Sequence, residues 1–306
     1  MRSEITTQAD IQQFVHSVEQ GKAAYLPRLL LFILAGIALA LAYLLIQFRG
    51  LSTPVGIDQA QIARELSRGN GFSTKDIRPL EAHLLEKTFG QVPPGNVPDL
   101  YHSPLNPAVN AGALYLTSAV LHLKIDHSDP AYRADRCIAA VSVLFFLLAL
   151  FINFLLAQLL FDRKVALLTT GLVLIADQFW QFSLSGLPQM LLLFLLSGCL
   201  WCLAKAVISQ RNGKKPLVWL ILLGLLQGAL ALTHPITLWL SAATWLFALL
   251  YFRPRVPGAL LAPLLCLALF SVWIVRDLKV SGTPFGIAPI ALLDNNGHTE
   301  TGWMRQ

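Results

Sequence analysis

The 306 residues are 55% hydrophobic and only 13% charged, whereas soluble proteins carry about 25% charged residues. The apolar residues fall in runs long enough to cross a bilayer, which takes about 20 residues per helix, so the chain is predicted to be an all-α polytopic membrane protein. The net charge of +6 comes from Lys and Arg clustered between those runs. This pattern is typical of membrane topology signals and excludes a nucleic-acid partner.

The chain begins with a polar tail, residues 1–25, which we expect in the cytosol. Within it, residues 8–19 place Ile11, Phe14 and Val18 at helical spacing and predict a helix lying on the membrane surface. The first span is predicted at 26–47. Because a long polar tail precedes it, this span is interpreted as an anchor and not as a cleaved signal peptide.

A polar stretch directly after the first span contains the most suggestive acid of the sequence. We predict a short helix with Asp58 at its N-cap, Ile62 and Leu66 on one face, and Gly69 as its C-terminal stop. A carboxylate just outside a membrane can serve chemistry. It can equally serve as a cap that stabilises the helix by about 0.5–2 kcal/mol, and local sequence leaves both interpretations open.

Residues 108–123 form a further apolar segment, and Asn106-Pro107 is a good helix start before it. If this segment does not cross the membrane, the basic pairs and clusters between later spans all fall in the cytosol. If it crosses, every one of them moves outside. Basic residues in short loops favour the cytosolic side. We therefore predict an interfacial helix inside a long outer loop, 48–135, that also carries Asp58.

This choice gives about seven transmembrane helices in a single domain covering residues 1–306. Six further spans fill 136–275, and residues 276–306 form a second outer loop. The predicted spans are 26–47, 136–160, 165–182, 186–205, 217–233, 235–252 and 257–275.

The sequence does not predict a metal or nucleotide site. All four cysteines lie in or beside apolar runs, as buried small hydrophobic residues do, so we expect neither disulfides nor a metal site there. No glycine-rich phosphate-binding loop occurs. The cysteines are Cys137, Cys199, Cys202 and Cys266.

Several short motifs, in this order and with this membrane sidedness, resemble GT-C type polyprenyl-phosphate-dependent glycosyltransferases. The branch resembled is glycosyltransferase family 39-like and contains the protein O-mannosyltransferases and the lipid A aminoarabinose transferases. The resemblance covers nearly the whole chain, and it implies a GT-C-like helical bundle with juxtamembrane helices in the first outer loop. Its motifs are Asp58 with Ala63 to Phe72, Tyr101 to Tyr115, Ala134-Asp135-Arg136, Gly224 to Pro235, and Trp273 to Pro284.

The resemblance implies a transferase that moves a sugar from a polyprenyl-phosphate carrier to a glycan, lipid or protein acceptor on the outer face. Asp58 would be the general base. The enzyme would need no cofactor, would sit among membrane lipids, and would belong to a bacterial inner membrane with its N-terminus in the cytosol. Five arginines are candidates for holding the donor phosphate, although each could instead sit at lipid headgroups: Arg64, Arg68, Arg78, Arg136 and Arg276.

The sequence departs from the family pattern in three ways. Gln189 stands where a second acid is common, and Asp177 is a possible substitute; His234 stands where Arg is common. Relatives also continue beyond the equivalent of Gln306, so this chain is expected to be either the N-terminal part of a longer enzyme or a naturally shortened version. These departures leave an alternative open, a catalytically inactive or truncated GT-C-like scaffold. A transporter is less favoured, because the spans carry few charges and no inverted repeat.

Overall fold

The computed structural model describes residues 25–92, 95–121, 132–252 and 256–287. The chain divides into two compact units, one ending at Phe48 and one beginning at Arg49, and each is described by itself. The helix expected over residues 8–19 lies outside the described residues.

Between Tyr25 and Phe48, the part of the first unit that the structure describes, the chain forms a single apolar helix. α2 (Tyr25–Ala42) continues into a π-helical turn, Tyr43–Gln47, so the helix predicted at 26–47 is confirmed. The stretch Leu30–Gln47 is long and apolar enough to cross a membrane.

The second unit begins with the elements of the predicted outer loop, which are called the outer-loop elements below. The predicted helix around Asp58 and the predicted helix after Asn106 are both present, and they are α3 (Pro54–Ser67) and α5 (Leu105–Leu121). Between them lie elements that the sequence analysis did not predict: β1 (Ser73–Thr74), α4 (Pro79–Phe89) and β2 (Val97–Pro98). The two short strands pair antiparallel, which is the one departure from an all-helical fold in the described chain.

Local signals explain α4. Pro79 occupies its first turn, where the missing N–H costs nothing. The Glu81 carboxylate accepts a hydrogen bond from the backbone N–H of Arg78, and Gly90 ends the helix in the left-handed conformation at φ +77°.

The remaining elements are helices that coincide with the six further predicted spans. They are α6 (Arg133–Leu160), α7 (Arg163–Ile175), α8 (Asp177–Leu184), α9 (Gln189–Arg211), α10 (Leu217–Thr233), α11 (Thr237–Tyr251) and α12 (Val256–Ser281).

Two of these boundaries correct the sequence prediction. The segment predicted as one span at 165–182 is a pair of helices bent by 56°; the break leaves the Leu174 carbonyl without its helical donor, and the buried Trp180 Nε1–H donates to it at 2.7 Å. The expected outer loop from Arg276 instead begins as the last turns of α12, which runs on to Ser281.

Four helices in the described chain are long and apolar enough to cross a membrane, and a fifth is added if the bent pair α7–α8 counts as one span. The four segments are Leu30–Gln47, Arg133–Leu160, Gln189–Arg211 and Ala259–Ser281. The apolar helices α10 and α11 are shorter, with 17 and 15 residues. The chain is thus a helical protein of the integral membrane class.

Close packing between α10 and α12 depends on small residues. A Cβ at Gly224 would lie 2.6 Å from the Ala262 carbonyl oxygen, and one at Gly228 would lie 2.7 Å from Leu269 Cδ1, so only glycine permits this approach. On another side of α10, buried Gln227 donates to Thr244 and accepts from Trp245 Nε1 at 2.7 Å. These bonds join α10 to α11.

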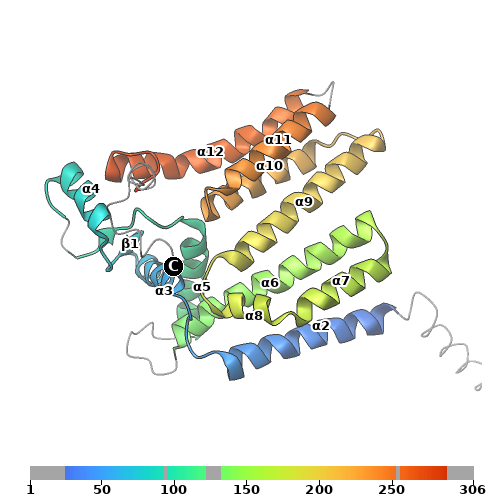
Figure 1. Ribbon diagram of the computed structural model, residues 1–306, viewed down its shortest axis with the longest axis horizontal. Coiled ribbons are helices and arrows are strands. Elements are labelled where there is room, and N and C mark those ends of the chain that lie inside the picture. The colour runs from blue at the N-terminus through green and yellow to red at the C-terminus, as the bar shows by residue number, and fades with distance from the viewer. Residues whose placement is uncertain (1–24, 93–94, 122–131, 253–255, 288–306) are drawn as a thin grey trace, which may run out of the picture. The chain divides into compact units, whose positions relative to one another are not determined.

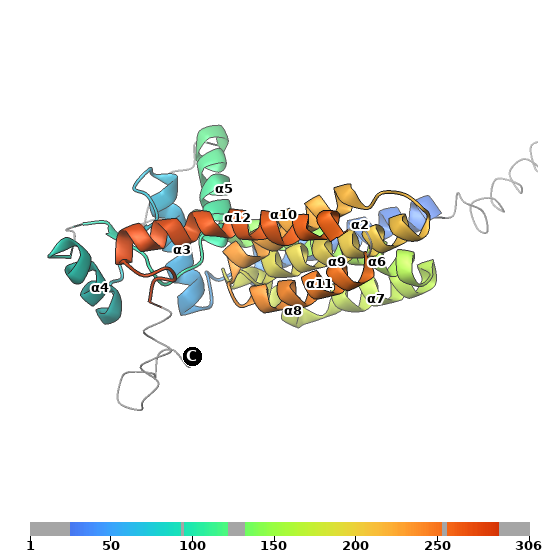
Figure 2. The ribbon, with the colours of Figure 1, turned by 90° about the horizontal axis from the view of Figure 1, so that it is seen from above.

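Within the second unit, the long helices and the outer-loop elements occupy different ends. In Figures 1 and 2, the links that follow α6 and α9 lie at the end of the bundle opposite α3 and α4. Figure 2 also shows α3 and α5 crossing the direction shared by α6, α9 and α12, and the two crossing helices pack against each other.

Candidate functional site

The N-terminus of α3 is fixed to the turn between α8 and α9. Thr53 is the N-cap: its side chain accepts from Gly56 N at 3.1 Å and donates to the Ser185 carbonyl at 3.0 Å. Any Cβ at Gly56 would clash with that carbonyl. Pro54 therefore opens the helix four residues before Asp58, and the prediction that Asp58 is the N-cap is wrong. Its carboxylate is not needed for capping.

Asp58 lies on the wall of α3 beside Arg78. Its Oδ2 accepts from Arg78 Nη2 at 2.8 Å, and 21% of its side chain is exposed to solvent. Burial raises the pKa of the Asp58 carboxyl above its ordinary value, against the opposing charges of Arg78 and His102. A partly exposed carboxylate with a raised pKa is a better proton acceptor than an ordinary surface aspartate.

Arg78 is the centre of a buried ion cluster. Besides Asp58, its guanidinium lies 3.6 Å from Asp99 Oδ2 and 3.7 Å from Glu81 Oε1, and both of these side chains are fully buried. Its guanidinium carbon is 4.3 Å from the centroid of the Tyr101 ring. One cation thus serves three carboxylates and an aromatic face.

Glu81 joins α4 to the segment that follows β2. Its two carboxylate oxygens accept from the backbone N–H groups of Arg78 and Leu100, at 3.3 and 3.1 Å. Burial, and then the neighbouring Asp99 charge, raise the pKa of Glu81. This carboxylate therefore links the backbone at Arg78 to the backbone at Leu100.

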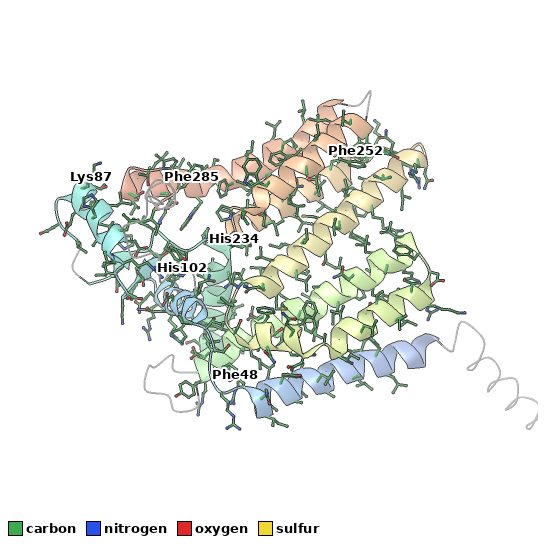
Figure 3. All side chains as sticks on the ribbon, viewed as in Figure 1. Phe48, Lys87, His102, His234, Phe252 and Phe285 are labelled. Atoms are coloured by element: carbon green, nitrogen blue, oxygen red, sulfur yellow. The ribbon has the colours of Figure 1, made fainter. Side chains whose placement is uncertain are left out.

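Asp99 and His102 form a carboxylate–imidazole pair within the cluster. Asp99 Oδ1 accepts from the backbone N–H groups of Tyr101 and His102, and its Oδ2 is 3.0 Å from His102 Nδ1. Burial alone would raise the pKa of Asp99, but the His102 hydrogen bonds and the Arg78 charge outweigh it and lower the pKa. His102 Nε2 is buried and has no hydrogen-bond partner among the described residues. Figure 3 labels His102 at the junction of the outer-loop elements and the long helices.

Arg276, near the end of α12, holds the outer-loop segments in place. Its Nη1 donates to the Asp99 carbonyl at 2.7 Å and to Asp277 at 2.9 Å, and its Nη2 donates to the Phe72 carbonyl at 3.3 Å. The guanidinium carbon also lies 4.6 Å from the Trp273 ring centroid and 5.3 Å from that of Phe72. Its donors are directed at the protein itself.

The structure brings together some predicted site residues and separates others. Asp58 and Arg78 are in direct contact, and Arg276 joins them through Asp99. Arg64 instead pairs with Asp135 on α6, next to Arg136 in the first turn of that helix. Arg68 pairs with Glu65 at 3.1 Å.

The residues that replace family positions lie at helix starts or turns. Asp177 begins α8, is exposed, and accepts from Gln181. Gln189 begins α9, with its Oε1 buried and without a hydrogen-bond partner in the described chain. His234 follows α10 and is exposed; Figure 3 labels it at the end of that helix.

Sequence reasoning did not identify Glu81, Asp99 or His102 as site residues. Asp99 and His102 stand three apart just before a helix start, and Glu81 stands at the third position of α4. Both spacings are compatible with local side-chain to backbone hydrogen bonds, but neither predicts that Asp99 lies beside Arg78. A separate buried pair, Gln59 and Asn106 at 2.6 Å, fixes α3 to α5.

Within the described ranges, no group of three or more His, Cys, Asp and Glu side chains is arranged to hold a metal ion. No family model, curated protein or solved structure matches this chain.

Proposed function

We propose that this chain is a membrane glycosyltransferase of GT-C type. It transfers a sugar from a polyprenyl-phosphate carrier to an acceptor hydroxyl at the outer face of the membrane, with Asp58 as general base. The observation that carries the proposal is the environment of the Asp58 carboxylate. This group does not cap α3, it is partly exposed, and burial raises its pKa. The buried Arg78 donates a hydrogen bond to it at 2.8 Å.

In the proposed reaction, the acceptor oxygen attacks the anomeric carbon of the carrier-linked sugar. The bond from that carbon to the phosphate oxygen breaks, and the polyprenyl phosphate leaves with the electron pair. The acceptor proton passes to Asp58. Arg78 keeps the carboxylate oriented through the step.

A cation is needed where the phosphate leaves. Arg78 and Arg276 direct their donors at carboxylates and carbonyls of the protein, and Arg64 is paired with Asp135. Arg68 pairs with Glu65 but keeps 29% of its side chain exposed, more than Arg64, Arg78 or Arg276. Arg136 lies in the first turn of α6. We propose Arg68 and Arg136 for the donor phosphate. We assign the other three arginines to the framework of the site.

The proposed orientation places α3, α4 and α5 outside and the N-terminus in the cytosol of a bacterial cell. Arg163 and Lys164 begin α7 directly after the α6–α7 link, and Arg211 ends α9 just before Lys214 and Lys215 in the α9–α10 link. Their position opposite α3 and α4 (Figures 1 and 2) supports a cytosolic placement, because basic residues of short loops favour that side. In this arrangement α10 and α11 are spans as well, which makes seven.

The proposal is tested with Asp58→Asn in the full chain, reconstituted in membranes that contain polyprenyl-phosphate sugars. Asn keeps an acceptor oxygen for Arg78 but takes no proton. We expect normal folding and a loss of transfer of roughly 10²–10⁴-fold, the usual contribution of a positioned base. Asp162→Asn is the matched control: Asp162 caps α7 by accepting from Val165 N at 2.8 Å, Asn caps a helix about as well, and the variant should keep its activity.

Transfer at the wild-type rate by well-folded Asp58→Asn protein would remove the base assignment. If the wild-type chain binds the carrier lipid but transfers nothing to any acceptor, the scaffold alternative replaces the enzyme.

A further inference from the structure

Lys205 is a charged residue inside an apolar helix. It is the only Asp, Glu, Lys or Arg of α9 apart from Arg211, which ends the helix, and at about 1.5 Å per residue it lies roughly 9 Å before that end. Because α9 is long and apolar enough to cross a membrane, the Lys205 ammonium belongs near the boundary between acyl chains and headgroups. An ionisable side chain in such a position is costly unless an anion accompanies it.

The described part of the chain supplies no such anion to Lys205. No Asp or Glu occurs between Asp177 and Asp277, so α10, which packs against α9, has none. The helices α6 and α8 also pack against α9, but Asp135 of α6 pairs with α3 and Asp177 accepts a hydrogen bond within α8. Asp162, in the link after α6, caps α7. These carboxylates are engaged elsewhere, which leaves the ammonium to an anion from outside the chain.

The link between α9 and α10 adds two lysines close to Lys205. Ser209 follows Lys205 by one helical turn and therefore shares its face. The Ser209 carbonyl accepts from the Lys214 backbone N–H at 2.9 Å, and the Ser209 hydroxyl donates to the Lys215 carbonyl at 3.4 Å. These bonds hold the backbone of two exposed lysines beside Ser209, about 6 Å along α9 from Lys205. Long lysine side chains span that distance, so all three ammonium groups can reach one anion.

Two tryptophans and an apolar surface adjoin these lysines. Trp201 lies one turn before Lys205 on α9, and the Lys205 ammonium is 5.5 Å from the centroid of its ring. The Trp219 ring of α10 meets the Trp201 ring at 5.3 Å, with an interplanar angle of 89°. Nearby apolar side chains are open to the surroundings, with Leu200 43% and Val218 63% exposed. The lysines thus border an apolar surface, with tryptophan at the boundary, as is common at membrane interfaces.

An anionic phospholipid combines the groups that this surface can bind. Its phosphate pairs with ammonium groups at headgroup depth, and its acyl chains cover the exposed apolar side chains. Free phosphate would leave the apolar surface unused. A zwitterionic lipid also carries a phosphate, but its own cationic group would be repelled by three lysines. The surface therefore favours a lipid whose headgroup has a net negative charge.

We propose that the α9–α10 link and the adjoining face of α9 form a binding site for an anionic phospholipid. The phosphate pairs with Lys205 and with the lysines of the link, and the acyl chains run along α9 and α10 past Trp201 and Trp219. This site lies at the end of the bundle opposite α3 and α4 (Figures 1 and 2). It is therefore distinct from the place proposed above for the polyprenyl-phosphate carrier, and it does not rest on the proposed function.

Lys164 supplies a matched control. It is an exposed lysine in the first turn of α7, next to the link that follows α6 at the same end of the bundle. If the lysines at this end attracted anionic lipids only through the general charge of the surface, Lys164 and Lys205 would respond alike to substitution.

The test measures the dissociation constants of dioleoylphosphatidylglycerol and dioleoylphosphatidylcholine for the purified full chain in an uncharged detergent, by native mass spectrometry. We expect wild-type protein to bind phosphatidylglycerol about 25- to 125-fold more tightly, because each lysine near an anionic headgroup contributes about fivefold. Lys205→Gln should lower that preference about fivefold, and the Lys214→Gln/Lys215→Gln pair should lower it at least as much. Lys205→Arg and Lys164→Gln should keep it.

Equal binding of the two lipids by wild-type protein would overturn the site. A preference retained in Lys205→Gln, or lowered equally in Lys164→Gln, would also overturn it and leave only general charge attraction. A loss in Lys205→Gln that Lys205→Arg shares would contradict the charge pairing. Displacement of phosphatidylglycerol by an equal concentration of glycerol 3-phosphate, which has the phosphate but no acyl chains, would show a site for free anions instead of a lipid site. None of these measurements involves sugar transfer, so the proposed function is tested separately.

Discussion

Two stretches of the same helix show two different ways of holding a neighbour. Along Ala262–Leu269, α12 meets α10 through contacts that exist only because Gly224 and Gly228 have no side chain. Along Trp273–Asp277, it meets the outer loop through Arg276, whose donors reach the carbonyls of Phe72 and Asp99. The first contact is made by shape and the second by directed hydrogen bonds.

The difference determines what each contact can do. A shape-dependent contact depends on the volume of the packed groups and confers no chemistry. The directed contact fixes the Asp99 backbone, and with it the carboxylate that orients His102 and faces Arg78. The polar end of α12 thus positions the candidate site, while the apolar end holds the bundle together. Because charges buried in pairs are costly to separate, the polar end should respond most strongly to substitution.

The largest effect is expected from Arg78→Met. The substitution leaves Glu81 and Asp99 fully buried without their cation, and breaking a buried pair in this way costs about 3–5 kcal/mol. We expect that loss in the free energy of unfolding in detergent, together with loss of sugar transfer. Arg68→Met, at a side chain that is 29% exposed, should cost less than about 1 kcal/mol. Equal losses in the two variants would show that the cluster is not a centre of stability.

The sequence predicted the helices better than the cluster, for a physical reason. Apolar runs and caps are local, so α2, α6, α9 and the end of α3 at Gly69 follow from neighbouring residues. The cluster depends on contacts between segments that are distant in the sequence: Arg78 lies beside Asp99 because β1 pairs with β2. Two-residue strands carry no periodic signal.

Asp58 illustrates the same limit. The N-cap prediction was wrong because Thr53 and Pro54 start the helix four residues earlier, and what fixes that start is a contact with Ser185, 132 positions along the chain. Asp58 is nevertheless one of the residues that gather at Arg78, a contact that the sequence analysis did not predict, and its role as general base stays a prediction.

Asp99→Asn is expected to change the acid limb of the stability curve. The pKa of Asp99 is lowered in the folded chain, so its stabilising contribution is present above its unfolded pKa, about 3.9, and is lost as the pH falls through the folded value. The variant should lose about 1.5–3 kcal/mol at pH 7, as for hydrogen bonds to a charged group. On acidification, the free energy of unfolding of the variant should fall less than that of the wild type.

The matched control for this titration is Glu81→Gln, because the pKa of Glu81 is raised and its contribution has the opposite sign. Protonation of Glu81 adds stability as the pH falls through its folded value. Removing Glu81 should therefore make acid destabilisation steeper. Identical acid limbs in the Asp99→Asn and Glu81→Gln variants would be incompatible with the two opposite shifts.

Gly224→Ala tests the apolar end of α12. The added Cβ would lie 2.6 Å from the Ala262 carbonyl oxygen, so the two helices must separate, at a cost of about 1–3 kcal/mol. Gly112→Ala in α5 is the control, because a Cβ there meets nothing within 4 Å; it should be neutral or stabilising by up to about 1 kcal/mol. Sugar transfer per folded molecule should be unchanged in both variants, since neither touches the outer-loop cluster.

The smallest effect is expected from Gln227→Leu, which removes the two side-chain hydrogen bonds that join α10 to α11 in the described part of the chain. Gln227 donates to Thr244 and accepts from Trp245 Nε1, but such bonds between membrane helices contribute only about 0.6 kcal/mol on average, because the unfolded chain in a membrane also finds partners. A double-mutant cycle with Trp245→Phe, followed by unfolding in detergent, isolates the Trp245 bond. A coupling free energy of several kcal/mol would mean that directed bonds hold the apolar region as firmly as they hold the cluster around Arg78, and the contrast between the two ends of α12 would then disappear.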